Sequence, residues 1–156
     1  MRVLVCGGRD YTNWERLFQV LDHYHAWQPF SDLIHGAASG ADTLAKEWAW
    51  SRSIVASPFP ADWDNLRRPG AIIRYRNGKP YNAAAGFARN ADMLVTGKPD
   101  LCIAFPGGEG TKDMVNRALI ALGEMIMPTL HTAMTDLDPR VRQHAIATER
   151  LLHNPD

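Results

Sequence analysis

Residues 100–114 read DLCIAFPGGEGTKDM, and this stretch decides the fold. After Asp100 the run to Phe105 is apolar, which is typical of a strand buried on both faces. A proline and three glycines follow within 106–110 and end that strand. From Thr111 to Leu122 the apolar residues recur at helical spacing. A buried strand, a glycine-rich turn and a helix in that order predict one βα unit of a parallel sheet.

Strands and helices also alternate on either side of this unit. Such alternation is typical of βαβ units, with helices on both faces of a mainly parallel sheet. We therefore predict an α/β fold, a single doubly wound domain over 1–156 with about five strands. The other expected strands are Arg2–Cys6, Asp32–His35, Ile54–Ala56 and Met125–Leu130. The other expected helices are Asn13–Trp27 (capped by Thr12), Ala41–Arg52, Ala83–Thr96 and Asp138–Leu152.

Residues 64–82 interrupt the alternation. Ile73–Arg76 alternates in polarity and is followed by Asn77-Gly78, a strong hairpin signal, so we predict an inserted β-hairpin. The segment 65–91 contains no acidic residue, and its basic residues are Arg67, Arg68, Arg74, Arg76, Lys79 and Arg89. We favour a solvated or dimer-forming flap over the site, with a nucleic-acid surface as the alternative.

Composition narrows the class of protein. The chain has 156 residues, of which 46% are hydrophobic and 22% charged, so a globular domain is expected and disorder is not. Lys+Arg and Asp+Glu balance at 17 each, which gives no global attraction to nucleic acid or anionic lipid. Cys6 and Cys102 lie in separate apolar runs, which argues against a disulfide framework or a zinc site. We expect no signal peptide or membrane span, a cytoplasmic location, and neither a cofactor nor a metal.

Glycine-bearing loops follow three of the expected strands, at 7–10, 35–42 and 106–111. In the common doubly wound orders the first strand lies beside the fourth, and ligands bind at the crevice between them. Glycine brings backbone amides close to a ligand, and a helix that starts directly afterwards offers free N–H groups to a phosphate. These loops therefore predict a phosphate-binding site at one edge of the sheet. The dinucleotide fingerprint GxGxxG does not follow the first strand.

Five segments carry a family resemblance: GGRDY (7–11), HGAASGAD (35–42), ADW (61–63), AGFARNADML (85–94) and PDLCIAFPGGEGTKDM (99–114). Together they resemble the YspA/YpsA-related SLOG family, which is kin to the LOG-type phosphoribohydrolases. The resemblance covers about residues 1–130. It implies a Rossmann-like fold, a nucleotide or nucleotide-derived ligand and a homodimer. For the LOG branch it also implies hydrolysis of the N-glycosidic bond of a nucleoside 5′-monophosphate.

The resemblance also implies roles for individual residues. Arg89 falls where the LOG pattern has its active-site arginine, and Gly107, Gly108, Gly110 and Thr111 match the phosphate-binding loop. The position of the catalytic glutamate is occupied by Met114, which cannot transfer a proton or stabilise a positive sugar. Asp113 and Glu109 are the carboxylates nearest to that position in the sequence. The candidate catalytic residues are Arg89, Glu109 and Asp113.

The predicted function is binding of a nucleotide or nucleotide derivative, such as a nucleoside monophosphate or an ADP-ribose-like molecule, in the manner of a ligand sensor. Hydrolysis of a nucleotide is the first alternative and a nucleic-acid-binding module the second; nucleic acid is the less favoured partner. Asp10 and Asp42 could contact ribose or cap helices, Arg9 and His35 could bind ligand or serve structure, and Trp63 could stack on a base or cover a sheet edge. The predicted ligand-binding residues are Gly7, Gly8, Arg9, Asp10, His35, Gly36, Gly40, Asp42, Arg89, Asn90, Pro106, Gly107, Gly108, Gly110 and Thr111.

Overall fold

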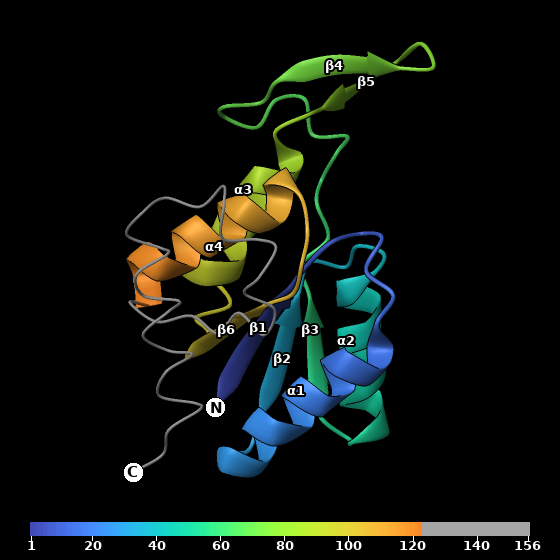
Figure 1. The fold of residues 1–156 in the computed structure, drawn as a ribbon. Helices are drawn as coiled ribbons and strands as arrows, with labels where there is room; N and C mark the ends of the chain where they lie inside the picture. The colour runs from blue at the N-terminus through green and yellow to red at the C-terminus, as the bar shows by residue number, and fades with distance from the viewer. Residues whose placement is uncertain (123–156) are drawn as a thin grey trace.

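The computed structural model describes residues 1–122, which form a four-stranded parallel sheet in the order β3-β2-β1-β6 (Figure 1). The doubly wound, Rossmann-like α/β fold expected from the sequence is confirmed. The sheet strands are β1 (Arg2–Cys6), β2 (Asp32–His35), β3 (Val55–Pro58) and β6 (Leu101–Ala104). The helices are α1 (Trp14–Trp27), α2 (Ala41–Ser51), α3 (Ala85–Val95) and α4 (Glu109–Leu122).

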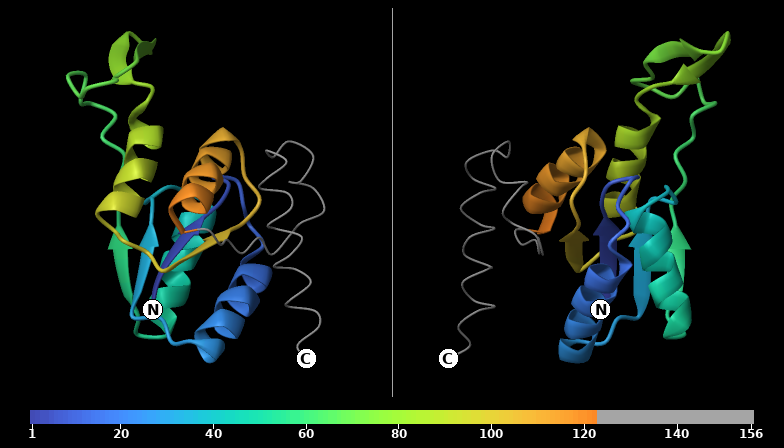
Figure 2. Two further views of the ribbon diagram at one scale, coloured as in Figure 1. Left: turned by 90° about the vertical axis from the view of Figure 1, so that its left-hand side faces the viewer. Right: turned by 45° about the vertical axis from the view of Figure 1, so that its right-hand side comes forward.

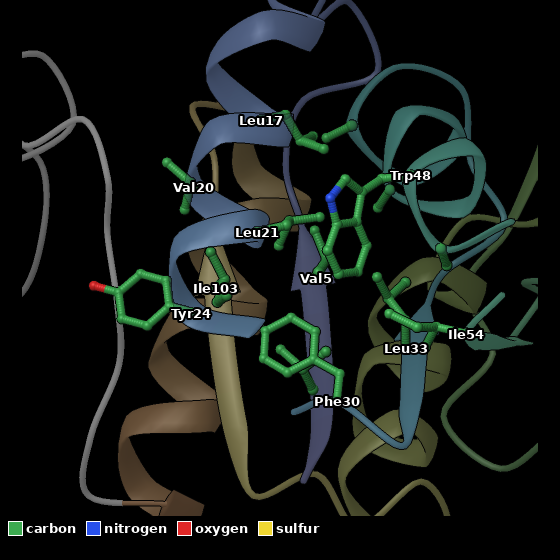
Figure 3. Close-up of a cluster of buried hydrophobic side chains, with 14 of the residues drawn as sticks. Val5, Leu17, Val20, Leu21, Tyr24, Phe30, Leu33, Trp48, Ile54 and Ile103 are labelled. Atoms are coloured by element: carbon green, nitrogen blue, oxygen red, sulfur yellow. The ribbon is translucent and has the colours of Figure 1, made fainter. Parts of the chain in front are cut away.

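The alternation of side chains along the central strands fills two separate cores, one on each face of the sheet. Val3 and Val5 of β1 belong to the core that side chains of α1 and α2 complete, among them the fully buried Trp48. Figure 3 shows Val5 and Trp48 in this core. Leu4 and Cys6 point to the other face and pack against side chains of α3 and α4. Figure 2 shows the two helix pairs on opposite sides of the sheet.

The strand order reverses between β1 and β6, because β1 pairs with β2 on one side and with β6 on the other. This is the predicted switch point. The first and third glycine loops meet there, since the amide of Gly8 donates to the carbonyl of Pro106 at 2.8 Å. The second loop joins them through the amide of Ala41, which donates to the carbonyl of Gly8 at 3.1 Å.

The inserted hairpin is also confirmed. It consists of β4 (Ile73–Arg76) and β5 (Lys79–Asn82), which pair antiparallel, and Asn77 and Gly78 both adopt positive φ in the turn. The hairpin stands clear of the sheet, beyond the amino end of α3 (Figures 1 and 2). At its root the side-chain oxygen of Asn82 accepts from the amides of Ile72 and Ala84, which fixes the hairpin to α3.

Several boundaries differ from the expected ones. Asn13, not Thr12, caps α1, because its side-chain oxygen accepts from the amide of Arg16 at 3.0 Å. Helix α4 begins at Glu109, two residues before the expected start, so part of the glycine loop is already helical. The expected strand 125–130 and helix 138–152 lie outside the described residues. Within residues 1–122, no helix has both the length and the apolar character needed to cross a membrane.

Candidate functional site

A cleft of about 400 Å³ opens at the switch point. Its floor is apolar and is formed by Cys6, Met93 and Met114, while loops and helix ends form its walls. The cleft brings together three segments that are far apart in the sequence: the end of β1, the face of α3 and the start of α4. Its lining residues are Cys6, Gly7, Gly8, Arg9, Asp10, Ala38, Asp42, Trp63, Ala83, Gly86, Phe87, Arg89, Asn90, Met93, Gly108, Glu109, Gly110, Thr111 and Met114.

The amino end of α4 forms one wall of the cleft, through residues 108–111. Gly108 precedes the helix, and its carbonyl accepts the amide of Lys112 at 3.0 Å. The first N–H groups of a helix have no acceptor within the helix, and the helix dipole makes this end attractive to anions. A Cβ atom added at Gly108 or at Gly110 would meet nothing within 4 Å, so the backbone is open to the cleft at both positions.

The other glycines of the three loops are packed. A Cβ at Gly7 would lie 2.6 Å from the Cβ of Ala41, and one at Gly8 would lie 2.9 Å from the carbonyl oxygen of Pro106. Gly40 has a φ of +73°, and a Cβ there would collide with the backbone of Gly8 and Arg9. A Cβ at Gly107 would collide with the side chain of Thr111. These glycines hold the three loops together, which leaves Gly108 and Gly110 as the open positions of the phosphate-type loop.

Arg89, on α3, joins the cleft to the 36–40 loop. Its Nη1 donates to the carbonyl of Gly36 and, at 3.4 Å, to the carbonyl of Phe59. Its Nε donates to the side-chain oxygen of Asn90 at 3.2 Å. These bonds fix the guanidinium while the side chain still lines the cleft. Burial lowers the pKa of Arg89, but an arginine retains its charge in proteins.

Asp42 is a buried carboxylate at the cleft wall, with 6% of its surface exposed. Its Oδ2 accepts from the amide of Ala38 at 3.1 Å. Burial raises the pKa of Asp42, and hydrogen bonds from the amides of Ala38 and Gly36, together with the charges of Arg89 and Arg9, oppose that rise. Asp42 therefore stabilises the loop before α2 and also lines the cleft. The helix-capping role expected for it is wrong, because Gly40 is the N-cap of α2 and no side chain caps this helix.

Asn90 is 3% exposed and connects α3 to the first turn of α4. Its Nδ2 donates to the carbonyl of Gly110 at 3.0 Å and to Oδ2 of Asp113 at 2.9 Å. Arg117 donates to the same oxygen of Asp113 at 2.8 Å. Asp113 does not line the cleft, so the structure separates it from the other two candidate catalytic residues, Arg89 and Glu109, which do.

The position of the LOG-type glutamate lies at the cleft floor. Met114 occupies it and is 1% exposed, packed into the core between the sheet and α3. The carboxylates that do line the cleft are Asp10, Asp42 and Glu109. Glu109 projects into solvent at the mouth of the cleft and forms an ion pair with Lys112 at 3.0 Å.

His35 lies beneath its loop. It is 3% exposed, its Nδ1 accepts from the amide of Ala37 at 3.1 Å, and it does not line the cleft. Burial lowers the pKa of His35, and the charges of Lys46 and Arg89 lower it further, so the neutral imidazole is favoured. These contacts match the structural interpretation of His35. Gly36 lines a neighbouring pocket and not the cleft, and Pro106 contributes the carbonyl that holds Gly8.

Two aromatic side chains line the cleft wall beside α3. The guanidinium of Arg9 lies over the ring of Trp63, with its Cζ atom 5.5 Å from the ring centroid. The backbone carbonyl of Trp63 accepts a hydrogen bond from the amide of Asn82 at the root of the hairpin. Phe87 is 41% exposed on α3 and was missed by the sequence analysis. The signal for Phe87 was available: residues 85 and 93 are the buried apolar positions of this helix, and 87 is off that face.

The chain is similar to known proteins over most of its length. A family model described as the YspA, cpYpsA-related SLOG family matches residues 1–65. The gene 61 protein of Mycobacterium phage D29 is 30% identical over 125 residues, which cover 75% of this chain and 87% of the phage protein. The chain belongs to the YspA, cpYpsA-related SLOG family. No solved structure matches it significantly.

Membership of this SLOG family indicates nucleotide-related, small-molecule binding at a coarse level. The arrangement of the cleft is compatible with that chemistry, since it combines an apolar floor, aromatic walls, an arginine and a helix amino end. Within residues 1–122, no three His, Cys, Asp or Glu side chains are grouped in a way that could hold a metal ion.

Proposed function

We propose that this SLOG protein binds a nucleotide or nucleotide derivative in the switch-point cleft, as a ligand sensor does. The phosphate lies at the amino end of α4, and the base lies over the apolar floor. The observation that carries the proposal is the open backbone at Gly108, directly before α4, and at Gly110, in its first turn, where the helix faces the cleft.

The surrounding side chains support the same placement. Arg89 supplies a fixed positive charge. It donates a hydrogen bond to Asn90, and Asn90 in turn donates to the carbonyl of Gly110 in the first turn of α4. The exposed ring of Phe87 and the ring of Trp63 offer faces on which a base can stack. Charge at one end and apolar or aromatic surface at the other match the two ends of a nucleotide.

The experiment that tests the proposal is a melting-temperature screen of the full chain with AMP, GMP, CMP, UMP, ADP-ribose, NAD and ribose 5-phosphate. A ligand present at about 100 times its Kd stabilises the folded state by about 2.7 kcal/mol. For a chain of this size that raises the Tm by roughly 5–10 °C. We expect such a shift with at least one compound of the set, and no shift with any of them would contradict the proposal.

Hydrolysis of the bound nucleotide is a second candidate, favoured by the carboxylates Asp10, Asp42 and Glu109 at the cleft. Cleavage of a ribose–base bond builds positive charge on the sugar, which a nearby carboxylate stabilises. Incubation with the nucleotide that binds, followed by chromatography of the free base, measures the activity. Asp10→Asn, Asp42→Asn and Glu109→Gln each remove one of these carboxylates, and the variant that removes the catalytic group should lose base release and still bind. Full activity in all three variants, and in Asp113→Asn, would rule out hydrolysis by these carboxylates.

A further inference from the structure

A second pocket of about 240 Å³ opens beside the cleft. It lies between the loop that follows β2 and the segment 60–63 that follows β3. Arg9, Ala38, Trp63 and Arg89 line both the pocket and the cleft, so the two spaces share one wall. The binding of a mononucleotide in the cleft makes no use of this pocket.

The shared wall carries more positive than negative charge. Arg9 and Arg89 both contribute guanidinium groups to it, and the charge of Arg9 is close enough to disfavour that of Arg89. Asp42 is the carboxylate whose charge acts on both arginines, and its own ionisation is disfavoured by burial. The residues that line both spaces include these two guanidiniums and no carboxylate, since Asp10, Asp42 and Glu109 line the cleft alone. The positive charge of the shared wall favours an anion at the junction of the two spaces.

The two spaces differ in character. The cleft has an apolar floor and aromatic walls, which suit a nucleobase. The second pocket is lined by small residues, among them Gly36, Ala37 and Ser39, so that backbone groups and a hydroxyl form much of its wall. A hydroxyl-rich group of about the size of a sugar fits such a wall better than a second base does, because its hydroxyls can pair with these polar groups.

The junction is also tied to the proposed phosphate site. Arg89 bonds to Asn90, and Asn90 bonds to the carbonyl of Gly110 in the first turn of α4. Two anion-binding elements, the helix end and the pair of arginines, are therefore linked through one buried side chain. Adjacent phosphates of a single ligand can be held by these two elements together.

We propose that the ligand is a nucleoside diphosphate that carries a further sugar-sized polar group. The nucleoside lies in the cleft, the diphosphate extends from the amino end of α4 to Arg9 and Arg89, and the polar group occupies the second pocket. This inference rests on the proposed function, since it extends the ligand from the same cleft.

The test compares matched pairs of probes by calorimetry: AMP with ADP-ribose, and UMP with UDP-glucose. In at least one pair the extended probe should bind about tenfold more tightly than the monophosphate, or better. Ala61 and Ser39 line the second pocket and not the cleft, so Ala61→Phe and Ser39→Phe each fill that pocket alone. Either variant should remove the advantage of the extended probe and leave the Kd of the monophosphate within about twofold.

Ala26→Phe, at an exposed position on α1, is the matched control and should retain the advantage. Equal affinities within both pairs would overturn the extended ligand and leave the proposed function standing. The same holds if the advantage survives both pocket-filling variants. If none of the four probes binds, this inference is overturned, and the proposed function falls with it only if the seven-compound screen also shows no shift.

Discussion

The loop after β2 and the loop after β6 both place glycines at the same edge of the sheet, for different physical reasons. Gly40, after β2, has a positive φ and contacts the backbone of another loop, so no side chain fits there. Gly110, after β6, has open space where a Cβ would be. The comparison teaches that glycine is required for packing at Gly40 and for access at Gly110, while Gly107, in the same loop as Gly110, belongs with the packed glycines.

The largest expected effect breaks the packed loop. Gly40→Ala forces a side chain into the left-handed region and against the backbone of Gly8 and Arg9. The backbone conformation alone costs about 1–3 kcal/mol, and the collision adds to it. We expect urea unfolding to show a loss of at least about 3 kcal/mol in the free energy of unfolding. An alanine variant with wild-type stability would show that the loop is not closed as described.

The next effect removes the support of the open loop. Asn90→Ala removes the buried side-chain amide that donates to the carbonyl of Gly110 and to Asp113, so Asp113 keeps only the donor from Arg117. The expected loss is about 1–3 kcal/mol in the free energy of unfolding, together with weaker nucleotide binding. Asn116→Ala is the matched control, because Asn116 is exposed on α4 and does not line the cleft. Equal stability of the two variants would contradict the role given to Asn90.

A substitution at the open glycine should have a smaller effect, which raises stability and weakens nucleotide binding. Gly110 lies in a helix without positive φ, so Gly110→Ala should stabilise the fold by about 0.5–1 kcal/mol. The added methyl group lies in the cleft beside the first-turn amides. Binding should therefore weaken by about tenfold or more, as seen in the Kd. A variant that is both destabilised and unable to bind would show that Gly110 belongs with the packed glycines.

The smallest expected effect is a pH dependence of the free energy of unfolding, which arises from the buried carboxylate of Asp42 beside the packed loop. Burial raises the pKa of Asp42 above its ordinary value of 3.8, so the folded state holds this proton more tightly than the unfolded chain. The stability from this group is present below 3.8 and is lost as pH rises through the folded-state pKa. Wild-type stability minus that of Asp42→Asn should fall across this window in urea unfolding. A difference that rises with pH would mean that hydrogen bonds and arginines outweigh burial.

The sequence predicted the βα units and the hairpin because their signals are local. The apolar run of β1 and the Asn77-Gly78 turn are each readable within a few residues, and both were confirmed. The pairing of β1 with β6 followed from a general rule about doubly wound sheets and was confirmed as well.

Which glycines are packed and which are open to the cleft could not be predicted, because this depends on atoms that are distant in the sequence. The space at Gly40 is filled by residues 8 and 9, and only the folded chain shows this. Positions 113 and 114 illustrate the same point. Neighbouring helical side chains point about 100° apart, so Met114 faces the cleft while Asp113 points to Arg117. The roles proposed for the site residues and the expected homodimer stay predictions.

The most direct test of the central claim, that a nucleotide phosphate lies at the open end of α4, is calorimetric titration of three proteins. They are the wild type, Gly110→Ala and the control Asn116→Ala, each titrated with the nucleotide that gives the largest Tm shift. We predict that the wild type and the control bind equally and that Gly110→Ala binds about tenfold more weakly or not at all, while remaining at least as stable as the wild type. Equal binding by all three proteins would contradict the claim.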